Sequence, residues 1–501
     1  MSKNRDVFTI IGLATCVKIL LVWTYRSTDF EVHRNWLAIT HSLPLKEWYR
    51  ERTSRWTLDY PPLFAWFEWF LSQIAARVDP KMLNVENLEY ASEETILFQR
   101  FSVMCSDAVL FYAAYVWHGI CFEQTQRLPR LFKPLVLVGL ILNPGLLIVD
   151  HIHFQYNGIL MGIMLLSMAR IYQGHVLWGT LWFSILLNMK HIYLYIAPPF
   201  FIYLLRTYVL SEKNVRLQAI RLSQLGLIVA GVFSISFGPF IYHGQIRQVL
   251  SRLFPVRRGL LHSYWAPNIW ALYGFCDEIL RWFARKLGFG VPAQTITKGL
   301  VQEAKFAVLP NVPSWLTIVA ALVLMTPSLY KLFRKPCREA FLHSVVYCGC
   351  VSFLVGFHVH EKAILIPLLG LLPLAVRRPE LSGLFVAFSA TGHFSLFPLL
   401  PNEQERFLKT ALVLLYAFYI HKALSALRGR PALARLSKIY LLGLAPLFLY
   451  TEIISKVMPS RYEFLPLMGT SVYCAIGILH CFIPFSFAQD YTKLSERFKR
   501  Q

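Results

Sequence analysis

The sequence has few charged residues for its length, and acidic residues are the scarcer kind. Only 16% of the 501 residues are charged and 56% are hydrophobic, with 28 acidic residues against 50 basic ones. A soluble protein of this length needs more polar surface. The composition therefore excludes an ordinary globular protein and is typical of a chain that crosses a membrane many times.

Three further absences narrow the class. The nine cysteines are scattered, and only Cys276 falls in a long non-cytosolic loop, so no disulfide framework is expected. The chain has no Asn-x-Ser/Thr sequon, so glycosylation gives no independent check on topology. No internal repeat is visible, which counts against the inverted-repeat transporters.

Long apolar stretches are abundant by contrast. We expect about fourteen membrane spans, each close to the ~20 residues that a bilayer requires. They are predicted near residues 7–24, 95–121, 132–150, 157–172, 175–188, 191–209, 223–242, 313–332, 339–357, 362–376, 381–398, 408–425, 438–457 and 464–484. The sequence thus predicts an all-α polytopic membrane protein in which residues 1–501 form a single integral membrane domain.

The net charge of +22 reflects membrane orientation rather than a polyanionic partner. Basic residues concentrate in loops that alternate to one side, such as 206–221, 331–338 and 421–438. The positive-inside rule places that side, and both termini, in the cytosol. We expect no nucleic-acid partner. The first apolar stretch has no small-residue cleavage site, so it is predicted to be an uncleaved signal anchor.

Two long loops, 25–94 and 243–312, remain on the far side of the membrane. Both are rich in Trp, Tyr and Arg with Pro breaks, a composition that predicts amphipathic helices at the headgroup level. The unusual polar motifs of the chain gather on this same side. That convergence predicts an enzyme whose active site faces away from the cytosol.

The motif STDFEVHRNW follows the first span and carries Asp29 and Glu31. The simpler interpretation is a helix cap followed by acids that favour the helix dipole. The alternative is a carboxylate that takes a proton from a hydroxyl at the membrane face. Two acids without further ligands are weak evidence for a metal.

Two more motifs lie on the same side. Asp59 precedes a rigid Tyr-Pro-Pro turn and can orient a sugar or a cation, although an interfacial aromatic helix is the simpler interpretation. The run Asp150 to Asn157 holds two histidines and a glutamine. We interpret it as a polar lining rather than a metal site.

Basic residues form the last two motifs. Arg257 and Arg258 stand where positive charge is disfavoured, so a lipid phosphate is their expected partner, with snorkelling to headgroups as the alternative. The run His358 to Lys362 lies between two apolar stretches, and its His360 and Lys362 can join the two arginines in binding an anion. Within the spans, Lys18 and Asp107 are expected to pair, in a structural role.

These motifs resemble a known family. STDFEVHRNW, WTLDYPPLFAWFEW, FPVRRGL and HVHEKAILIPLL are similar to motifs of the dolichyl-phosphate-glucose-dependent α-1,3-glucosyltransferases of the endoplasmic reticulum. The resemblance covers essentially the whole chain, in order. Within the family, STDFEVHRNW and HSYWAPNIWALY look most like the branch that adds the second glucose to the lipid-linked oligosaccharide.

The resemblance implies a GT-C type fold with a luminal active site in the endoplasmic reticulum membrane. It implies dolichyl-phosphate-glucose as donor, Glc1Man9GlcNAc2 on dolichyl diphosphate as acceptor, an inverting reaction, and no metal or other cofactor. Asp29 would be the general base. The donor phosphate would be bound by Arg257, Arg258, His358, His360 and Lys362. Substrate contacts would come from Glu31, Arg34, Trp36, Asp59, Tyr60, His151, His153, Gln155, Tyr264 and Trp265.

Several alternatives stay open at this point. The paralogue that adds the first glucose to Man9GlcNAc2 shares most of these motifs, and a related enzyme with a mannose donor is a further rival. A lipid or solute transporter would place ionisable residues near mid-membrane on broken helices, whereas most of those here lie at one interface. A non-catalytic subunit is the last alternative.

Overall fold

The computed structural model describes residues 2–254, 259–262, 265–290, 306–458 and 464–488. Within these ranges the chain is helical and contains no β-strand. The chain divides into two compact units. The first comprises residues 1–123, 134–197 and 201–255, and the second comprises 124–133, 198–200 and 256–501.

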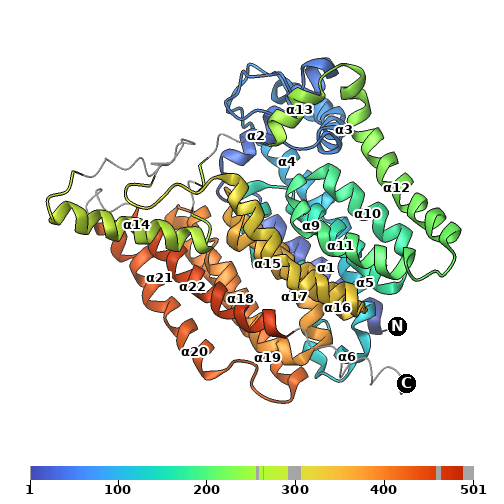
Figure 1. The fold of residues 1–501 in the computed structure, drawn as a ribbon. Coiled ribbons are helices and arrows are strands. Elements are labelled where there is room, and N and C mark those ends of the chain that lie inside the picture. Colours follow the sequence, from blue (N-terminus) through green and yellow to red (C-terminus); the bar gives the residue numbers. More distant parts are fainter. Residues whose placement is uncertain (1, 255–258, 263–264, 291–305, 459–463, 489–501) are drawn as a thin grey trace. The chain divides into compact units, whose positions relative to one another are not determined.

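The first unit contains the helices of the N-terminal half (Figure 1). Its main helices are α1 (Ser2–Leu20), α2 (Thr28–Ser42), α3 (Pro62–Val78), α4 (Glu93–Ser106), α5 (Ala108–Ile120), α7 (Leu135–Ile141), α8 (Pro144–Leu146), α9 (Asn157–Gln173), α10 (Val176–Met189), α11 (Ala197–Leu204), α12 (Val215–Tyr242) and α13 (Ile246–Leu253). Shorter 3-10 and π-helical segments are η1 (Leu45–Glu47), η2 (Pro80–Leu83), η4 (Leu147–Phe154), η5 (His191–Ile196) and η6 (Leu205–Val209). The division of the sequence between the two units at residues 123 and 124 falls within helix α6 (Phe122–Gln126).

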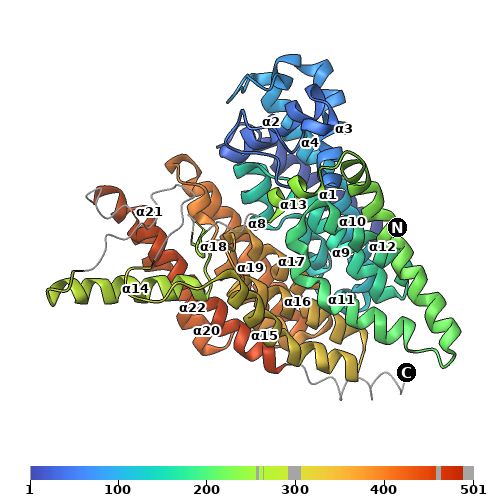
Figure 2. The ribbon, with the colours of Figure 1, turned by 45° about the horizontal axis from the view of Figure 1, so that its top comes forward.

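The centre of the first unit is the packing of α9 against α5 and α10. A Cβ at Gly162 would lie 2.6 Å from the backbone nitrogen of Leu110, so glycine lets α9 approach α5 closely, as small residues do between membrane helices. Helix α12 packs on α10, and α2 packs on α3 (Figure 2). The predicted first luminal loop, 25–94, contains the packed helices α2 and α3, in agreement with the helices that its composition predicts.

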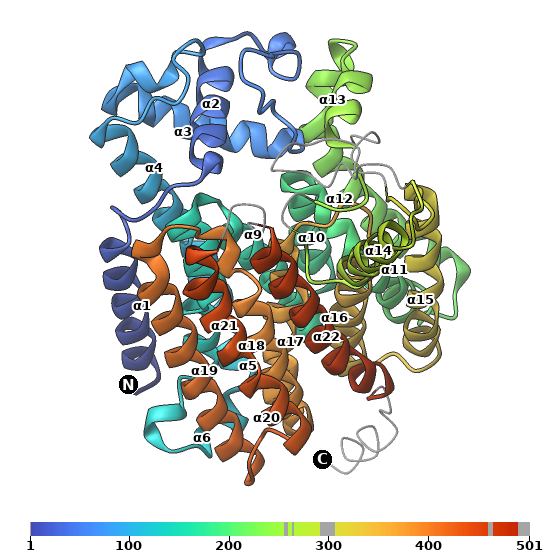
Figure 3. The same cartoon turned by 90° about the vertical axis from the view of Figure 1, so that its left-hand side faces the viewer.

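The second unit contains the C-terminal helices (Figure 3). Its main helices are α14 (Ile269–Lys286), α15 (Ser314–Arg334), α16 (Arg338–Val355), α17 (Leu365–Arg377), α18 (Ser382–Phe394), α19 (Arg406–Arg428), α20 (Arg435–Leu442), α21 (Leu444–Glu452) and α22 (Leu465–Phe487). Its short segments are η3 (Arg130–Phe132), η7 (Glu361–Ile364), η8 (Pro379–Leu381), η9 (Phe397–Leu399), η10 (Glu403–Glu405) and η11 (Ile454–Val457).

Helices α16 and α17 form the core of the second unit, since nearly every residue of both is buried. Neighbouring helices pack in chain order, with α15 on α16, α16 on α17, α17 on α18 and α18 on α19, while α22 returns to pack on α18 and α14. Helices α20 and α21 bury no residue completely. Their apolar side chains therefore face outward, as expected for helices in contact with lipid.

The structure confirms the all-α polytopic membrane fold. Among the described residues, ten helical segments are long and apolar enough to cross a membrane. They are 93–120, 135–154, 191–209, 215–242, 314–334, 338–355, 379–399, 403–428, 435–457 and 465–487. The other predicted spans coincide with α1, α9, α10 and α17, which are shorter or more polar.

Candidate active site

Asp29 lies in the first turn of α2, where the chain leaves α1. Ser27 caps the helix, because its hydroxyl oxygen accepts a hydrogen bond from the backbone N–H of Asp29 at 3.1 Å. Asp29 and Glu31 both lie in the first turn, where negative charge is favourable. The cap that the sequence predicts is therefore present, and it holds a carboxylate that is 23% exposed.

Two side chains from a segment far along the chain reach this carboxylate. The Gln155 amide donates a hydrogen bond to Asp29 Oδ2 at 2.6 Å, and His153 Nε2 lies 3.2 Å from the same oxygen. Three predicted site residues, Asp29, His153 and Gln155, thus meet in the first unit.

An unusual backbone conformation brings His153 and Gln155 to the Asp29 carboxylate. Residues Leu147–Phe154 form a π-helix, a conformation that often marks functional sites. It ends at Phe154, whose φ of 91° is rare for a residue with a side chain. Gln155 is then fully extended.

Buried donors satisfy the carbonyl groups that end this π-helix. The Arg100 guanidinium, 2% exposed, donates hydrogen bonds to the carbonyls of His151 and Ile152 at 2.9 and 3.0 Å. The Ser27 hydroxyl donates to the carbonyl of His153 at 2.7 Å. Ser27 therefore ties the start of α2 directly to the π-helix, which fixes Asp29 relative to His153.

His151 faces a different partner. Its Nε2 lies 2.8 Å from Asp107 Oδ2, and Lys18 Nζ lies 2.6 Å from the same oxygen. All three side chains are buried. The predicted pairing of Lys18 with Asp107 is confirmed, and the structure adds His151 to it. A Cβ at Gly158 would lie 1.8 Å from Asp107 Oδ1, so glycine is required beside this cluster.

Tyr60 and Asp59 lie near Asp29. Burial raises the pKa of the Tyr60 hydroxyl well above 10, and the negative charges of Asp59 and Asp29 act in the same direction. Tyr60 therefore stays protonated and can donate a hydrogen bond. Its ring also lies 4.8 Å from the Lys190 ammonium, a cation–π distance.

Contacts within the protein engage the side chains of Glu31, Arg34 and Trp36. Arg34 is fully buried, pairs with both carboxylate oxygens of Glu31 at 2.7 and 2.8 Å, and donates to the carbonyls of Met82 and Asn84. Trp36 is 2% exposed and packs on Tyr60. Their predicted role as substrate contacts stays a prediction, and the contacts shown here hold the segment 25–94 together.

A buried pair joins two of the sequence motifs, although sequence reasoning gave neither residue a role. His33 Nδ1 lies 2.7 Å from Glu68 Oε1, and the Glu68 side chain is completely buried. Burial raises the pKa of the Glu68 carboxyl, while the hydrogen bond from His33 lowers it. Residues 35 positions apart form this pair, so only the packing of α2 on α3 brings them together.

In the second unit, the segment after α16 carries the predicted phosphate-binding residues. His358 has a φ of 51°, and its backbone N–H donates to the carbonyl of Leu260 at 3.0 Å. Its Nδ1 lies 2.7 Å from the carbonyl of Gly259, which can only accept, so Nδ1 carries a proton. Gly259 and Leu260, which end the FPVRRGL motif, therefore contact His358 of the HVHEK motif.

His262, His360 and Glu361 form a compact group beside His358. Among the described residues, this is the group of His, Cys, Asp or Glu side chains that could hold a metal ion, with ligand atoms within 4.8 Å of one another. Glu361 is 2% exposed, and its Oε1 lies 2.9 Å from His360 Nδ1. Burial and the neighbouring His360 hold the pKa of His262 well below 6.5, whereas Glu361 acts in the opposite direction.

The remaining predicted residues fall into two classes. Arg257, Arg258 and Tyr264 lie outside the described residues. Lys362 is 8% exposed in η7, and Trp265 is 2% exposed and packs against Phe464. The sequence motifs contain His262, Glu361, Lys190 and Asn157, but sequence reasoning assigned them no role. Glu68 also lies in a quoted motif without an assigned role, and Arg100 lies in none of the motifs.

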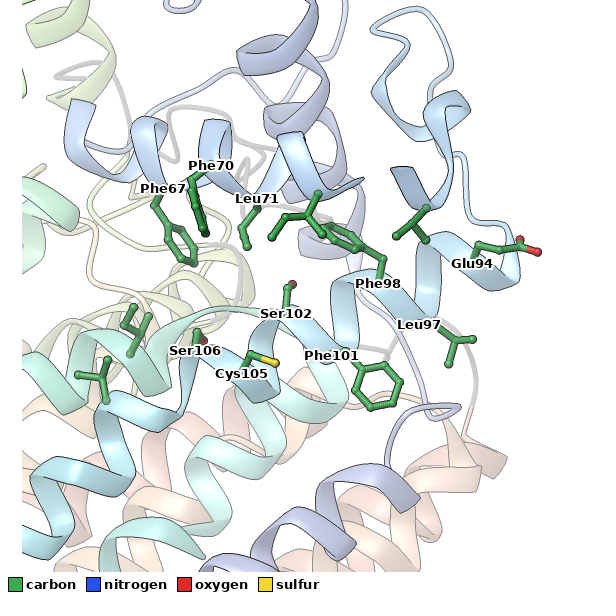
Figure 4. Close-up of a pocket in the computed structure, with 14 residues that line it drawn as sticks. Phe67, Phe70, Leu71, Glu94, Leu97, Phe98, Phe101, Ser102, Cys105 and Ser106 are labelled. Atoms are coloured by element: carbon green, nitrogen blue, oxygen red, sulfur yellow. The ribbon is translucent and has the colours of Figure 1, made fainter. Parts of the chain in front are cut away.

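An apolar groove lies in the first unit, between α3 and α4. It has a volume of about 650 Å³, and α3, α4, α5 and α9 line it. Figure 4 shows Phe67, Phe70 and Leu71 of α3 on one side and Phe98 and Cys105 of α4 on the other. Its wall includes Ser102, whose hydroxyl lies 2.7 Å from that of Tyr156, the residue after Gln155.

Comparison with known proteins shows which family the chain is similar to. Residues 14–485 match the ALG6, ALG8 glycosyltransferase family. A curated relative from Mus musculus, a dolichyl pyrophosphate Glc1Man9GlcNAc2 alpha-1,3-glucosyltransferase, is 46% identical over 492 residues, which cover 94% of each chain. The relative of the same name from Schizosaccharomyces pombe is 44% identical over 500 residues, covering 96% of this chain and 98% of its own.

The match covers nearly the whole chain and includes both units. The resemblance seen in the motifs is therefore confirmed over the full length of the fold. The chain belongs to the ALG6, ALG8 glycosyltransferase family.

Proposed function

We propose that this enzyme transfers glucose from dolichyl-phosphate-glucose to Glc1Man9GlcNAc2 on dolichyl diphosphate and forms an α-1,3 linkage. The observation that carries the proposal is the identity of 46% to a curated enzyme of that name, over 94% of both chains. The first-glucose paralogue is the closest rival among the activities, and no observation favours it.

The chemistry of the proposal is a single in-line displacement. The 3-hydroxyl oxygen of the terminal glucose of the acceptor attacks the anomeric carbon of the donor glucose, and the bond from that carbon to the phosphate oxygen breaks. The hydroxyl proton goes to the Asp29 carboxylate, and dolichyl phosphate leaves with the bonding electron pair. An inverted, α-linked product follows from a β-linked donor.

Asp29 suits the role of base because it is both positioned and accessible. The cap by Ser27 and the hydrogen bond from Gln155 hold it, while 23% of the side chain stays exposed. A positioned general base contributes about 10²- to 10⁴-fold to such a reaction. Of the predicted substrate contacts, the half-buried Asp59 and Tyr60 beside Asp29 are the best placed to orient the acceptor sugar.

The leaving phosphate gains negative charge during the reaction, and donors held in place stabilise such charge. We assign this role to His358, His360 and Lys362, together with Arg257 and Arg258. His358 supports the assignment, because its Nδ1 donates to Gly259 O and its ring is thereby oriented. The site needs no metal in this scheme.

The apolar groove beside α3 supports the lipid part of the proposal. We assign it to the dolichyl chain of the acceptor. Its walls are almost wholly apolar, as an isoprenoid chain requires. The Ser102–Tyr156 contact links the groove wall to the residue that follows Gln155, in the same unit as Asp29. Apolar residues and few polar groups are typical of lipid and small-molecule sites.

The proposed location is the endoplasmic reticulum membrane, with the Asp29 segment in the lumen and both termini in the cytosol. The ten apolar helices support a multi-pass membrane protein. The basic loops on one side support the orientation.

The decisive experiment is transfer by purified full-length protein in vitro. Dolichyl-phosphate-glucose is offered with dolichyl-diphosphate oligosaccharides that carry zero, one or two glucoses, and dolichyl-phosphate-mannose serves as the alternative donor. We expect glucose transfer to the acceptor with one glucose only, at a rate unchanged by EDTA.

Other outcomes separate the rivals. Transfer only to Man9GlcNAc2 identifies the first-glucose enzyme, and use of the mannose donor identifies a different transferase. Loss of transfer in EDTA, restored by a divalent ion, contradicts the metal-free scheme and points to His262, His360 and Glu361. No transfer under any condition contradicts an enzymatic role.

A further inference from the structure

A directed chain of hydrogen bonds runs from Lys190 to Asp29 in the first unit. The Lys190 ammonium lies 3.1 Å from Asn157 Oδ1. An ammonium can only donate, so the carbonyl oxygen of the Asn157 side chain must face it. The amide nitrogen of Asn157 then faces the other way.

That nitrogen meets two acceptors, which confirms its orientation. Asn157 Nδ2 lies 2.8 Å from Asp150 Oδ1 and 2.7 Å from Gln155 Oε1. Asp150 is completely buried and Asn157 is 5% exposed. Because the Asn157 amide donates to Gln155, the oxygen of the Gln155 amide is the acceptor there. Amide orientations are assigned from such networks, and this one permits a single choice.

The same reasoning fixes the last step. With its oxygen turned to Asn157, Gln155 must present Nε2 to Asp29, and Nε2 lies 2.6 Å from Asp29 Oδ2. A flipped Gln155 would place its oxygen against the carboxylate and repel it. A donor held against an ionised carboxylate stabilises the charged form. Together with His153, whose Nε2 lies 3.2 Å from the same oxygen, this chain keeps Asp29 able to accept a proton.

We propose that Gln155 is a positioning residue whose amide, oriented by Asn157 and Lys190, holds Asp29 in its ionised, proton-accepting state. This inference rests on the proposed role of Asp29 as the base. It differs from the role that the sequence suggested for Gln155, which was contact with a substrate. The two roles predict different kinetics, because a positioning residue changes the pH dependence and a substrate contact changes KM.

The test uses full-length Gln155→Leu and Gln155→Glu. Leu removes the donor, and Glu replaces it with a second negative charge. A neutral diazo reagent esterifies protonated carboxyl groups, and mass spectrometry of the Asp29 peptide follows the reaction against pH without any substrate. Gln73→Leu is the matched control, since Gln73 is exposed and its amide donates to the carbonyl of Trp69.

We expect esterification of Asp29 in Gln155→Leu to begin about one pH unit higher than in the wild type, and higher still in Gln155→Glu. The acidic limb of the pH–rate profile should move by the same amount, with KM for both substrates within about two-fold. The Gln73→Leu profile should match the wild type. Thermal melts of each detergent-solubilised variant identify any that fail to fold.

Two results overturn the inference. One is that Asp29 is esterified over the same pH range in Gln155→Leu as in the wild type. The other is an unmoved acidic limb with a KM for the acceptor raised ten-fold or more, which makes Gln155 a substrate contact. If esterification shifts as expected but wild-type protein transfers no glucose, the inference on Gln155 holds and the proposed function fails.

Discussion

At the scale of single residues, buried ionisable side chains of this protein have partners of opposite charge or polarity. Lys18 lies with Asp107 and His151, and Lys409, 1% exposed, lies 2.8 Å from Glu452. Removing one member of a buried pair leaves an uncompensated charge, at a typical cost of about 3–5 kcal/mol. Asp29 differs because it keeps nearly a quarter of its side chain exposed. That exposure suits a group that exchanges a proton with a substrate.

The first prediction concerns Asp29 itself. Asp29→Asn keeps the shape of the side chain but cannot take a proton, so we expect glucose transfer to fall by about 10²- to 10⁴-fold with an unchanged melting temperature. Transfer assays and thermal melts measure the two quantities. Glu86→Gln, which changes an exposed acid in the same segment 25–94, is the control and should keep wild-type activity. Near-normal transfer by Asp29→Asn rules out Asp29 as the base.

The second prediction concerns the pair in the membrane. Lys18→Asp or Asp107→Lys should each destabilise the protein by about 3–5 kcal/mol, because two like charges then face each other in a buried place. The double exchange should recover part of this loss, and His151 beside position 107 limits the recovery. Thermal melts of the detergent-solubilised variants provide the comparison. If the double variant melts at no higher temperature than the less stable of the two single variants, Lys18 and Asp107 do not pair directly.

At the scale of elements, broken helices position the candidate site. The span 93–120 is interrupted at Asp107, between α4 and α5, and the span 135–154 widens into a π-helix. Each irregularity carries a polar group that faces the protein interior, where neighbouring groups satisfy it. Arg100 and Ser27 do this for the π-helix. Irregular backbone thus occurs where it presents His151, His153 and Gln155 to their partners.

The third prediction tests the groove between α3 and α4. Ile74→Trp and Cys105→Trp place a large ring in it, since both residues line it. If the groove holds the dolichyl chain of the acceptor, KM for that acceptor should rise several-fold, while an acceptor with a short phytanyl chain should be used as by the wild type. Leu13→Trp, on the exposed side of α1, is the control. Equal effects on both acceptors contradict this assignment.

At the scale of the whole molecule, the distribution of charge predicts the topology. Basic residues outnumber acidic ones by 50 to 28 and gather in loops expected to face the cytosol. Exposed apolar side chains are frequent on α12, α15 and α19, which is consistent with contact to lipid rather than water. Both features follow from a chain that folds in a bilayer.

The fourth prediction tests this topology. Cys276 is exposed and lies in the predicted second luminal loop, so a membrane-impermeant maleimide should label it only after sealed microsomes are permeabilised. An epitope tag at either terminus should be digested by external protease in intact microsomes. A variant with Cys16 and Cys105, the other exposed cysteines, replaced by Ser isolates the signal. Labelling of Cys276 in sealed microsomes contradicts the luminal assignment.

Part of the candidate site could be predicted from the sequence. The cap at the start of α2 depends on residues that are neighbours in the chain, and so does the placement of Asp29 in its first turn. The Lys18–Asp107 pair could be predicted because two charges in apolar spans have few other ways to be compensated. The contact of Gln155 with Asp29 joins residues 126 positions apart. No local pattern specifies it, because helix packing and the positive φ of Phe154 create it.

The sequence by itself determined the number of apolar stretches that become helices, the likeness to a glucosyltransferase family and the acid at the head of α2. Hydropathy, charge and helix capping depend on residues that are close in sequence, so they can be predicted from the sequence. Only the tertiary structure decided that His151 pairs with Asp107 while His153 approaches Asp29, and that Arg34 is buried against Glu31. His151 and His153 are close in sequence but have different partners, because the backbone turns between them. The partners themselves, Asp107 and Asp29, are distant from them in sequence.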